Sequence, residues 1–308
     1  MISELRASTI GNVKNPAFRA YAQTYVDIAS DFERAVESFG LPLSTDPCLR
    51  LDDRDVQRAL KEKGVTVANG GKSFSAGWLS PACLTCRKGR GTATFLTSTQ
   101  CPRRCFFCFN PNQEDYEHYL HHVHDVVAEL DDLHRRGMQC RDLALTGGEP
   151  LLHKRETLAF FERAGELYPN AHTRLYTSGT GLDETLLADL RDAGLREIRF
   201  SVKGDDSASE RAATLRLIEA STAYLETVMV EMPVMPDDQA FMKELLVSLD
   251  GIGAAGINLL ELCFPFHNAP EFARRGYRVK SRPYRVLYDY WYAGGLPIAG
   301  SEEACIDL

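Results

Sequence analysis

From residue 92 onward, short apolar segments alternate with longer segments whose apolar residues recur three and four positions apart. The first pattern predicts β-strands and the second predicts amphipathic helices. The predicted strands are 92–97, 142–146, 173–178, 197–203, 227–235 and 257–264. The predicted helices between them are 117–136, 155–168, 183–193, 209–224 and 239–254. Six successive strand–helix units favour a parallel sheet with right-handed crossovers.

These elements predict an α/β protein with a partial (β/α)6 TIM-like barrel, because six units are too few for a closed eight-stranded barrel. We place this barrel at residues 89–268. Residues 1–88 are predicted to form a mainly helical N-terminal extension with a hairpin. Residues 269–308 are predicted to form a short C-terminal tail that covers the barrel, with packing along a sheet edge as the alternative.

The extension has local patterns of its own but no obvious chemistry. Helical periodicity covers 17–39, and a second helix is predicted over 52–63. A hairpin is predicted over 65–75, around a turn sequence that starts at Asn69. We expect a packing or capping role for the extension, with substrate recognition or dimerisation as the alternative.

Several predicted barrel strands carry polar residues. Arg199, Ser201 and Lys203 would share one strand face, and Glu231 and Glu261 interrupt two other strands. Parallel strands that are buried on both faces are usually apolar throughout, and buried polar groups need partners. A charged ligand in the barrel lumen would supply these partners. Internal ion pairs or a different strand register are the alternatives.

The composition adds one unusual feature, which is the number of cysteines. Hydrophobic residues make up 44% and charged residues 25%, values that exclude a disordered or fibrous protein. The net charge of −8 makes nucleic acid and anionic membranes unfavourable partners. We find no targeting signal and no apolar run of membrane length, so we expect a cytoplasmic protein whose nine cysteines stay reduced. Clustered cysteines in that setting indicate metal or redox chemistry.

Cys101, Cys105 and Cys108 form a C-x3-C-x2-C motif directly after the first predicted barrel strand. Three thiolates on one loop suit an iron–sulfur cluster that keeps one iron open. Structural zinc is the competing interpretation, although it usually takes four Cys or His ligands. With this motif, the chain over residues 89–268 resembles the radical SAM superfamily, whose cluster triad these three cysteines match.

Other residues extend the resemblance. Phe107 matches the aromatic residue of the family that contacts adenine. Gly147, Gly148 and Glu149 belong to a G-G-E-P segment, with which the family binds the methionine amino group of S-adenosylmethionine. Their chemistry agrees, because glycines permit close backbone approach and a carboxylate pairs with an ammonium. The resemblance also implies cofactor contacts at four further residues, namely Ser178, Ser201, Lys203 and His267.

Within the superfamily, the nearest resemblance is to glycyl-radical-enzyme activating enzymes of the pyruvate formate-lyase type. Gly89 and Gly91 stand where these enzymes have G-P-G, with Arg90 in place of the proline. His267 ends a segment similar to their P-Y-H, whereas Ser201 replaces the first residue of their D-x-K motif. Because of these departures, a relative that modifies a peptide or a small molecule fits nearly as well.

The resemblance implies a [4Fe-4S] cluster that reductively cleaves S-adenosylmethionine to a 5′-deoxyadenosyl radical, which abstracts hydrogen from a substrate. This substrate would be a protein glycine or a peptide, with a small metabolite as the alternative. A flavodoxin- or ferredoxin-type protein would donate the electron. No catalytic side chain is assigned. The alternative from another functional class is a non-catalytic zinc-binding adaptor that uses Cys83, Cys86 and two cysteines of the triad.

Two further groups of metal-ligating residues stand outside the triad. Cys83 and Cys86 form a C-x2-C motif, for which a second metal site or a redox pair is one interpretation. Two reduced thiols that pack a turn are the alternative. His118, His121 and His122 would share one face of the first barrel helix, where we expect a solvated polar surface rather than a metal site.

Overall fold

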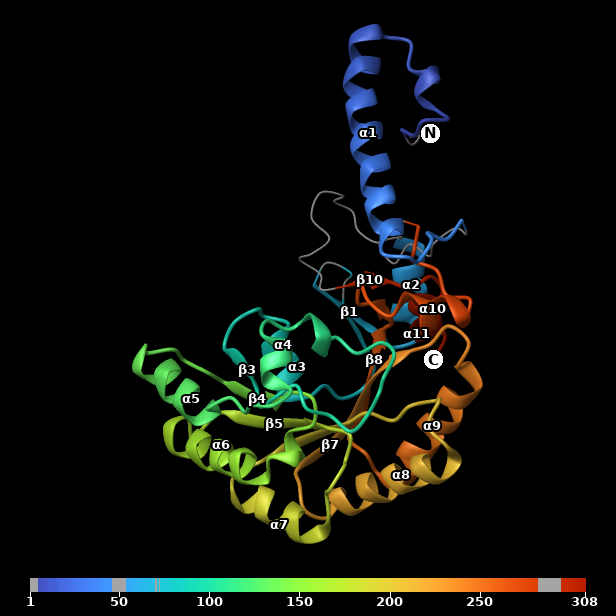
Figure 1. Ribbon diagram of the computed structural model, residues 1–308. Coiled ribbons are helices and arrows are strands. Elements are labelled where there is room, and N and C mark those ends of the chain that lie inside the picture. Colours follow the sequence, from blue (N-terminus) through green and yellow to red (C-terminus); the bar gives the residue numbers. More distant parts are fainter. Residues whose placement is uncertain (1–4, 46–53, 70, 72, 282–294) are drawn as a thin grey trace. The chain divides into compact units, whose positions relative to one another are not determined.

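The computed structural model describes residues 5–45, 54–69, 71, 73–281 and 295–308 (Figure 1). Residue contacts divide the chain into two compact units. The first unit comprises residues 1–48, 106–109 and 261–303. The second unit comprises residues 49–105, 110–260 and 304–308. The division into an extension, a barrel and a tail at residues 88 and 268 stays a prediction.

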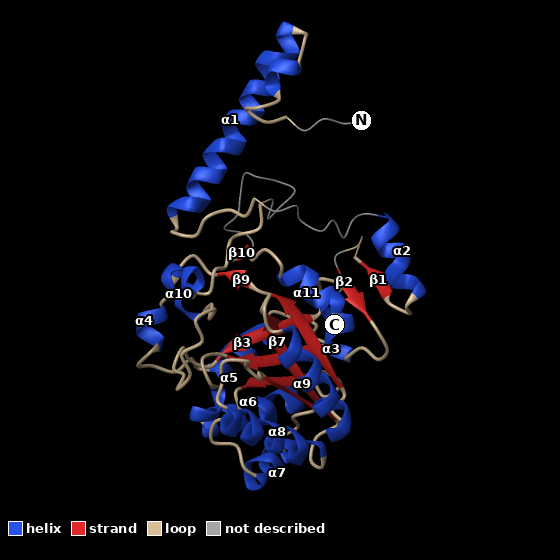
Figure 2. Cartoon of the chain, turned by 90° about the vertical axis from the view of Figure 1, so that its right-hand side faces the viewer, coloured by secondary structure: helices blue, strands red, loops and turns tan. Residues whose placement is uncertain are grey.

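The second unit is built around a six-stranded sheet with the order β3-β4-β5-β6-β7-β8. Figure 2 draws the strands of this sheet as red arrows. The strands are β3 (Thr92–Leu96), β4 (Asp142–Thr146), β5 (His172–Thr177), β6 (Glu197–Phe200), β7 (Thr227–Val234) and β8 (Gly256–Glu261). Consecutive strands are neighbours, and the pairs from β3 to β7 run parallel. This topology confirms the predicted α/β fold with a partial barrel.

Five helices connect the strands and lie along one side of the sheet (Figure 1). They are α5 (Val126–Arg135), α6 (Lys154–Leu167), α7 (Glu184–Asp192), α8 (Ala208–Thr222) and α9 (Gln239–Ile252). Their apolar faces pack on the strands and bury large side chains such as Phe160, Phe161 and Leu187 completely. This burial supplies the main driving force for folding of the unit.

The predicted single helix over 117–136 is wrong. The segment forms two helices, α4 (Tyr116–Tyr119) and α5. Between them, the amide N–H of His124 donates to the carbonyl oxygen of Thr97 at 2.8 Å, which draws the backbone out of a helical path. The side chain of Asp125 then caps the first turn of α5. The histidines of this segment therefore do not lie on one continuous helix.

Two predicted strands end three residues early in the structure. Strand β6 ends at Phe200, so Ser201 and Lys203 lie in the loop that follows and not on the strand. The last predicted strand is divided into β8 and β9 (Cys263–Phe264). At the division, the amide N–H of Leu262 donates to the hydroxyl of Ser301 at 2.7 Å and leaves the strand ladder.

The remaining elements belong to the extension, the connections and the C-terminal region. The helices are α1 (Pro16–Ser38), α2 (Arg54–Glu62), α3 (Pro81–Cys86), α10 (Ala269–Arg274) and α11 (Ser301–Asp307). The remaining strands are β1 (Thr66–Ala68), β2 (Ser73–Ser75) and β10 (Leu296–Pro297). The short 3-10 helices are η1 (Ile10–Asn12), η2 (Asn110–Asn112) and η3 (Pro150–Leu152). Both predicted helices of the extension and its hairpin are confirmed.

The predicted tail falls partly on residues 282–294, which lie outside the described residues. Of the helices that the structure describes, none combines the length and the apolar character needed to span a bilayer.

Candidate functional site

The loop after β4 lies directly on the loop after β3, backbone against backbone. The amide N–H of Gly148 donates to the carbonyl oxygen of Ser98 at 2.7 Å, and that of Glu149 donates to the carbonyl oxygen of Gln100 at 2.7 Å. A Cβ atom on Gly148 would lie 2.0 Å from the Gln100 oxygen, and one on Gly147 would lie 2.6 Å from the Ser98 oxygen. Only glycine permits this approach, so the G-G-E-P segment fixes the path of the chain into the cysteine motif.

Glu149 is fully buried and joins the carboxyl ends of β4 and β5. Its Oε1 accepts hydrogen bonds from the Thr177 hydroxyl at 2.6 Å and from the Leu151 amide at 3.2 Å. Its Oε2 accepts from the amide of Ser178 at 2.7 Å and from the hydroxyl of the same residue at 2.6 Å. Four donors therefore hold the buried carboxylate. Two residues predicted as separate cofactor contacts, Glu149 and Ser178, are direct partners.

Thr177 belongs to this site although the sequence analysis did not single it out. It is the last residue of β5 and is buried. Its hydroxyl both donates to Glu149 and accepts from the amide of Gly179 at 2.9 Å. Its position directly before Ser178, at a strand end, is the sequence signal that could have indicated it.

Cys101 and Cys105 belong to the second unit, together with the G-G-E-P segment. Both are free thiols, and the Cys101 sulfur accepts a hydrogen bond from the Arg103 amide at 3.4 Å. Desolvation raises the pKa of Cys101, and the charges of Glu149 and Cys105 raise it further. The Arg103 amide and the Lys203 ammonium oppose this shift.

Phe107, Cys108 and His267 belong to the first unit. The Nε2 atom of His267 lies 2.9 Å from the carbonyl oxygen of Cys108 and donates to it when that nitrogen is protonated. The rings of Phe107 and Phe106 pack edge to face, with their centroids 5.1 Å apart. Among the described residues, no three His, Cys, Asp or Glu side chains are arranged to hold a metal ion.

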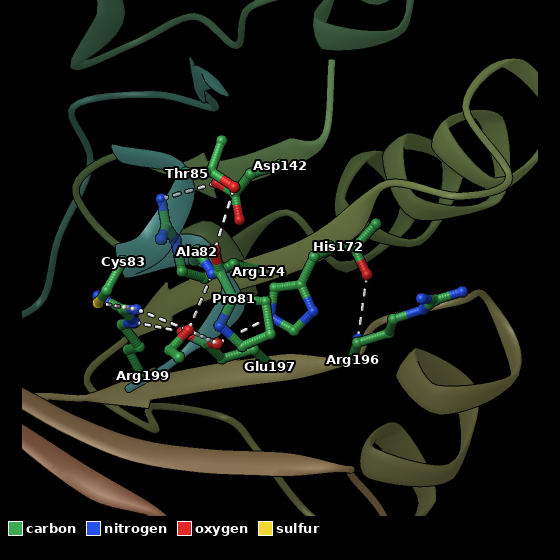
Figure 3. Close-up of polar contacts among 12 residues, drawn as sticks. Pro81, Ala82, Cys83, Thr85, Asp142, His172, Arg174, Arg196, Glu197 and Arg199 are labelled. Carbon is green, nitrogen blue, oxygen red and sulfur yellow. Dashed lines mark hydrogen bonds and ion pairs between the residues drawn. The ribbon is translucent and has the colours of Figure 1, made fainter. Parts of the chain in front are cut away.

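Near the amino ends of the strands, charged side chains form a buried network (Figure 3). Glu197 accepts hydrogen bonds from the Ser80 hydroxyl at 2.5 Å, from the His172 ring at 2.8 Å and from Nε of Arg199 at 2.5 Å. The guanidinium of Arg199 also pairs with Glu231. Internal ion pairs, rather than a charged ligand, therefore supply partners for these polar strand residues.

A second ion pair joins Arg174 on β5 to Asp142 on β4, at 3.2 Å (Figure 3). The ring of Tyr176 lies beside both cations, with its centroid 5.1 Å from the Arg174 guanidinium and 5.7 Å from that of Arg199. Burial raises the pKa of Tyr176 to about 12, and the charge of Glu231 adds to this shift. Tyr176 therefore stays protonated at physiological pH and is a poor general base.

Helix α3 packs at the amino ends of the strands and completes this network (Figure 3). Ser80 precedes the helix, caps it and donates its hydroxyl to Glu197. The Cys83 sulfur accepts a hydrogen bond from Nη2 of Arg199 at 3.3 Å, whereas Cys86 is exposed. Cys83 therefore lies toward the strand ends opposite to those that lead into the G-G-E-P segment and Ser178.

The network predicts that the fold is sensitive to acid. Burial alone would raise the pKa of Glu197, but His172, Arg199 and Ser80 outweigh it and lower this pKa to about 2. A carboxyl group whose pKa is lower in the folded than in the unfolded protein stabilises the fold. This stabilisation is complete at pH values above the pKa of the unfolded protein and is lost as the pH falls to the pKa of the folded protein. Glu197 should therefore contribute on the order of 3 kcal/mol above about pH 4.5, and this contribution should disappear as the pH falls toward 2.

Urea unfolding between pH 7 and pH 3 would measure this effect in the wild type and in Glu197→Gln. The variant should be less stable at pH 7, and its stability should depend less on pH in the acid range. Parallel loss of stability in both proteins would contradict the assignment.

Comparison with known proteins finds a family model that matches the central part of this chain. Residues 95–237 match the model of the Radical SAM superfamily, and this segment contains the cysteine motif, the G-G-E-P segment, the end of β3 and the strands β4 to β7. This match covers less than half of the chain and agrees with the predicted resemblance to the radical SAM superfamily.

Two curated proteins are similar to parts of this chain. A protein of Methanocaldococcus jannaschii, provisionally named a glycyl-radical enzyme activating enzyme, is 26% identical over 237 residues, which are 75% of this chain and 60% of that protein. The PqqA peptide cyclase of Rhizobium meliloti is 34% identical over 108 residues, which are 34% of this chain and 27% of the cyclase. The chain thus spans three fifths or less of the length of these relatives.

Solved structures were also found. Streptococcus suis SuiB bound to S-adenosylmethionine is 14% identical, with a TM-score of 0.46 over 55% of this chain and 40% of SuiB.

Proposed function

We propose that this protein is a radical SAM enzyme in which Cys101, Cys105 and Cys108 hold a [4Fe-4S] cluster. The observation that carries the proposal is the close backbone contact between the G-G-E-P segment and the loop that leads into the cysteine motif. This contact is specific to glycine and brings the predicted S-adenosylmethionine segment to the predicted cluster loop.

The residues present have the chemistry that such a cluster needs. The structure places none of these three cysteines in a disulfide, and thiolates are the usual ligands of iron–sulfur clusters. The three cysteines would hold the cluster and would leave one iron for S-adenosylmethionine. The bound cluster would supply the electron for reductive cleavage of S-adenosylmethionine, which would provide the 5′-deoxyadenosyl radical for hydrogen abstraction from the substrate.

The chain itself binds and orients the cofactor in this proposal. Glu149 offers a buried carboxylate for the methionine ammonium, with Ser178 and Thr177 keeping it in place. Lys203 is 93% buried on the loop after β6 and offers a cation to the methionine carboxylate. Phe107 offers an aromatic ring to the adenine, and His267 and Ser201 are the remaining proposed contacts.

For the substrate we propose a protein glycine or a peptide. This choice is supported by two relatives, one named for activation of a glycyl-radical enzyme and one for cyclisation of a peptide. A small metabolite remains the second candidate. The match to the model of an enzyme superfamily argues against the zinc-binding adaptor. We further propose a cytoplasmic location, in which the free thiols remain reduced, and a flavodoxin- or ferredoxin-type electron donor.

Reductive cleavage of S-adenosylmethionine tests the proposal directly. The protein is reconstituted with iron and sulfide without oxygen, reduced with dithionite and incubated with S-adenosylmethionine. We expect 5′-deoxyadenosine as the product. Absence of this product in a sample whose reduced cluster is intact by electron paramagnetic resonance would reject the proposed activity. Candidate partner proteins are then screened for a stable glycyl radical, and peptides for a change in mass.

A further inference from the structure

Arg103, within the cysteine motif, is held against the loop after β6 by two charged hydrogen bonds. Its Nη1 and Nη2 each lie 3.2 Å from one carboxylate oxygen of Asp206. Nη1 also lies 3.8 Å from the carboxylate of Glu210. The side chains of Arg103 and Asp206 are only 20% and 12% exposed. A bidentate ion pair of this kind fixes the relative orientation of the two side chains as well as their distance. Partial burial limits the screening of the pair by solvent.

The loop that contains Asp206 is held firmly from its other side. The amide of Asp206 donates to the carbonyl oxygen of Lys203 at 3.3 Å. The guanidinium of Arg211, on α8, donates to the carbonyl oxygen of Gly204 at 3.0 Å and to that of Asp206. A reciprocal capping box closes the first turn of α8 directly after the loop. Arg103 therefore ties the cysteine loop to a well-supported segment.

The same loop carries Lys203, three residues before Asp206, and this lysine is buried. The pair between Arg103 and Asp206 thus bridges two loops, one with Cys101 and Cys105 and the other with Lys203. The neighbouring Arg104 is exposed, and no ion pair to it is found among the described residues.

We propose that Arg103 and Asp206 form a positioning pair, which sets the spacing between the cysteine loop and Lys203 so that S-adenosylmethionine binds across both. This inference rests on the proposed function, because it concerns the same cofactor site. Neither residue needs to touch the reacting atoms. They act indirectly, because they fix the distance between Lys203 and the cysteine loop before the cofactor binds.

The test combines two measurements on Arg103→Ala, Asp206→Asn, the double variant and Arg104→Ala. Equilibrium dialysis gives the dissociation constant of S-adenosylmethionine for reconstituted protein whose iron content has been measured. Amide hydrogen exchange of residues 201–207 is measured in the metal-free protein. We expect Arg103→Ala to weaken S-adenosylmethionine binding about tenfold and to accelerate exchange of this loop. The double variant should be no worse than Arg103→Ala, and Arg104→Ala should behave as the wild type.

Three outcomes would overturn the inference. One is an unchanged dissociation constant in Arg103→Ala, even if the loop exchanges faster, since the pair would then be merely structural. Another is an additive effect of the two single substitutions. The third is an equal effect of Arg104→Ala, which would indicate general charge rather than a specific pair. If the wild type bound no S-adenosylmethionine, the proposed function would fail, whereas hydrogen exchange would still test whether the pair holds the loop.

Discussion

Alanine in place of Cys101, Cys105 or Cys108 is expected to remove most of the iron and to abolish formation of 5′-deoxyadenosine. Each thiolate supplies one of only three protein ligands, so the loss of one leaves the cluster without a complete set. The rate of 5′-deoxyadenosine formation should fall by more than about 100-fold. Loss of a residue that only orients a metal ligand costs at most about 100-fold, and loss of a ligand itself should cost more. Iron analysis and the cleavage assay, both without oxygen, measure the two effects.

Cys140→Ala is the matched control for these variants. Cys140 is also a free, partly buried thiol, but it precedes β4 and takes no part in the proposed site. This variant should keep the iron content and the cleavage rate of the wild type. Normal iron content in any variant of the triad would show that the cluster assignment is wrong at that position.

Arg199→Ala is expected to cause the largest loss of stability among single substitutions in the sheet. Arg199 is 3% exposed and pairs with two carboxylates, Glu197 and Glu231. Its removal leaves both acids partly or fully buried without their cation, and breaking a buried pair in this way typically costs about 3–5 kcal/mol. Urea unfolding at neutral pH measures the change in the free energy of unfolding.

A double-mutant cycle separates the effect of stranded charge from lost packing. If the unpaired carboxylates cause the loss, Arg199→Ala combined with Glu231→Gln should be less destabilised than the sum of the two single variants. Arg196→Ala serves as the control, because Arg196 is a partly buried arginine close by that enters no ion pair in the described part of the chain. It should change stability by less than about 0.5 kcal/mol. A change below about 1 kcal/mol in Arg199→Ala would refute the importance of the network.

The sequence predicted the sheet well because its strands are short, apolar and separated by long helical segments. Strand β4 was placed at its observed bounds, and the order of the six strands followed from their alternation with helices. Periodicity failed where a tertiary contact decided the path of the chain. The hydrogen bond from His124 to Thr97 breaks the first barrel helix, and no local pattern in the sequence indicates it.

The candidate site was also predicted from the sequence only where a local motif indicated it. The motifs indicated Gly147, Gly148 and Glu149, and the structure gives the glycines a steric reason and the carboxylate a set of four donors. Side-chain partners far apart in the chain were not predictable from spacing. The bond between Ser80 and Glu197 joins residues 117 positions apart. For the polar strand residues, the sequence analysis favoured a charged ligand in the lumen, and internal ion pairs, the alternative, supply the partners of Arg199 and Glu231.

Helix α3 has a consequence for how much of the chain forms one cooperative unit. It lies outside the matched segment 95–237, yet Ser80 and Cys83 contact the charged residues at the amino ends of the strands. A fragment that starts at residue 89 would expose those residues to water and lose a bond to Glu197. We therefore expect a stable fragment to include α3 as well as the segment that matches the radical SAM model.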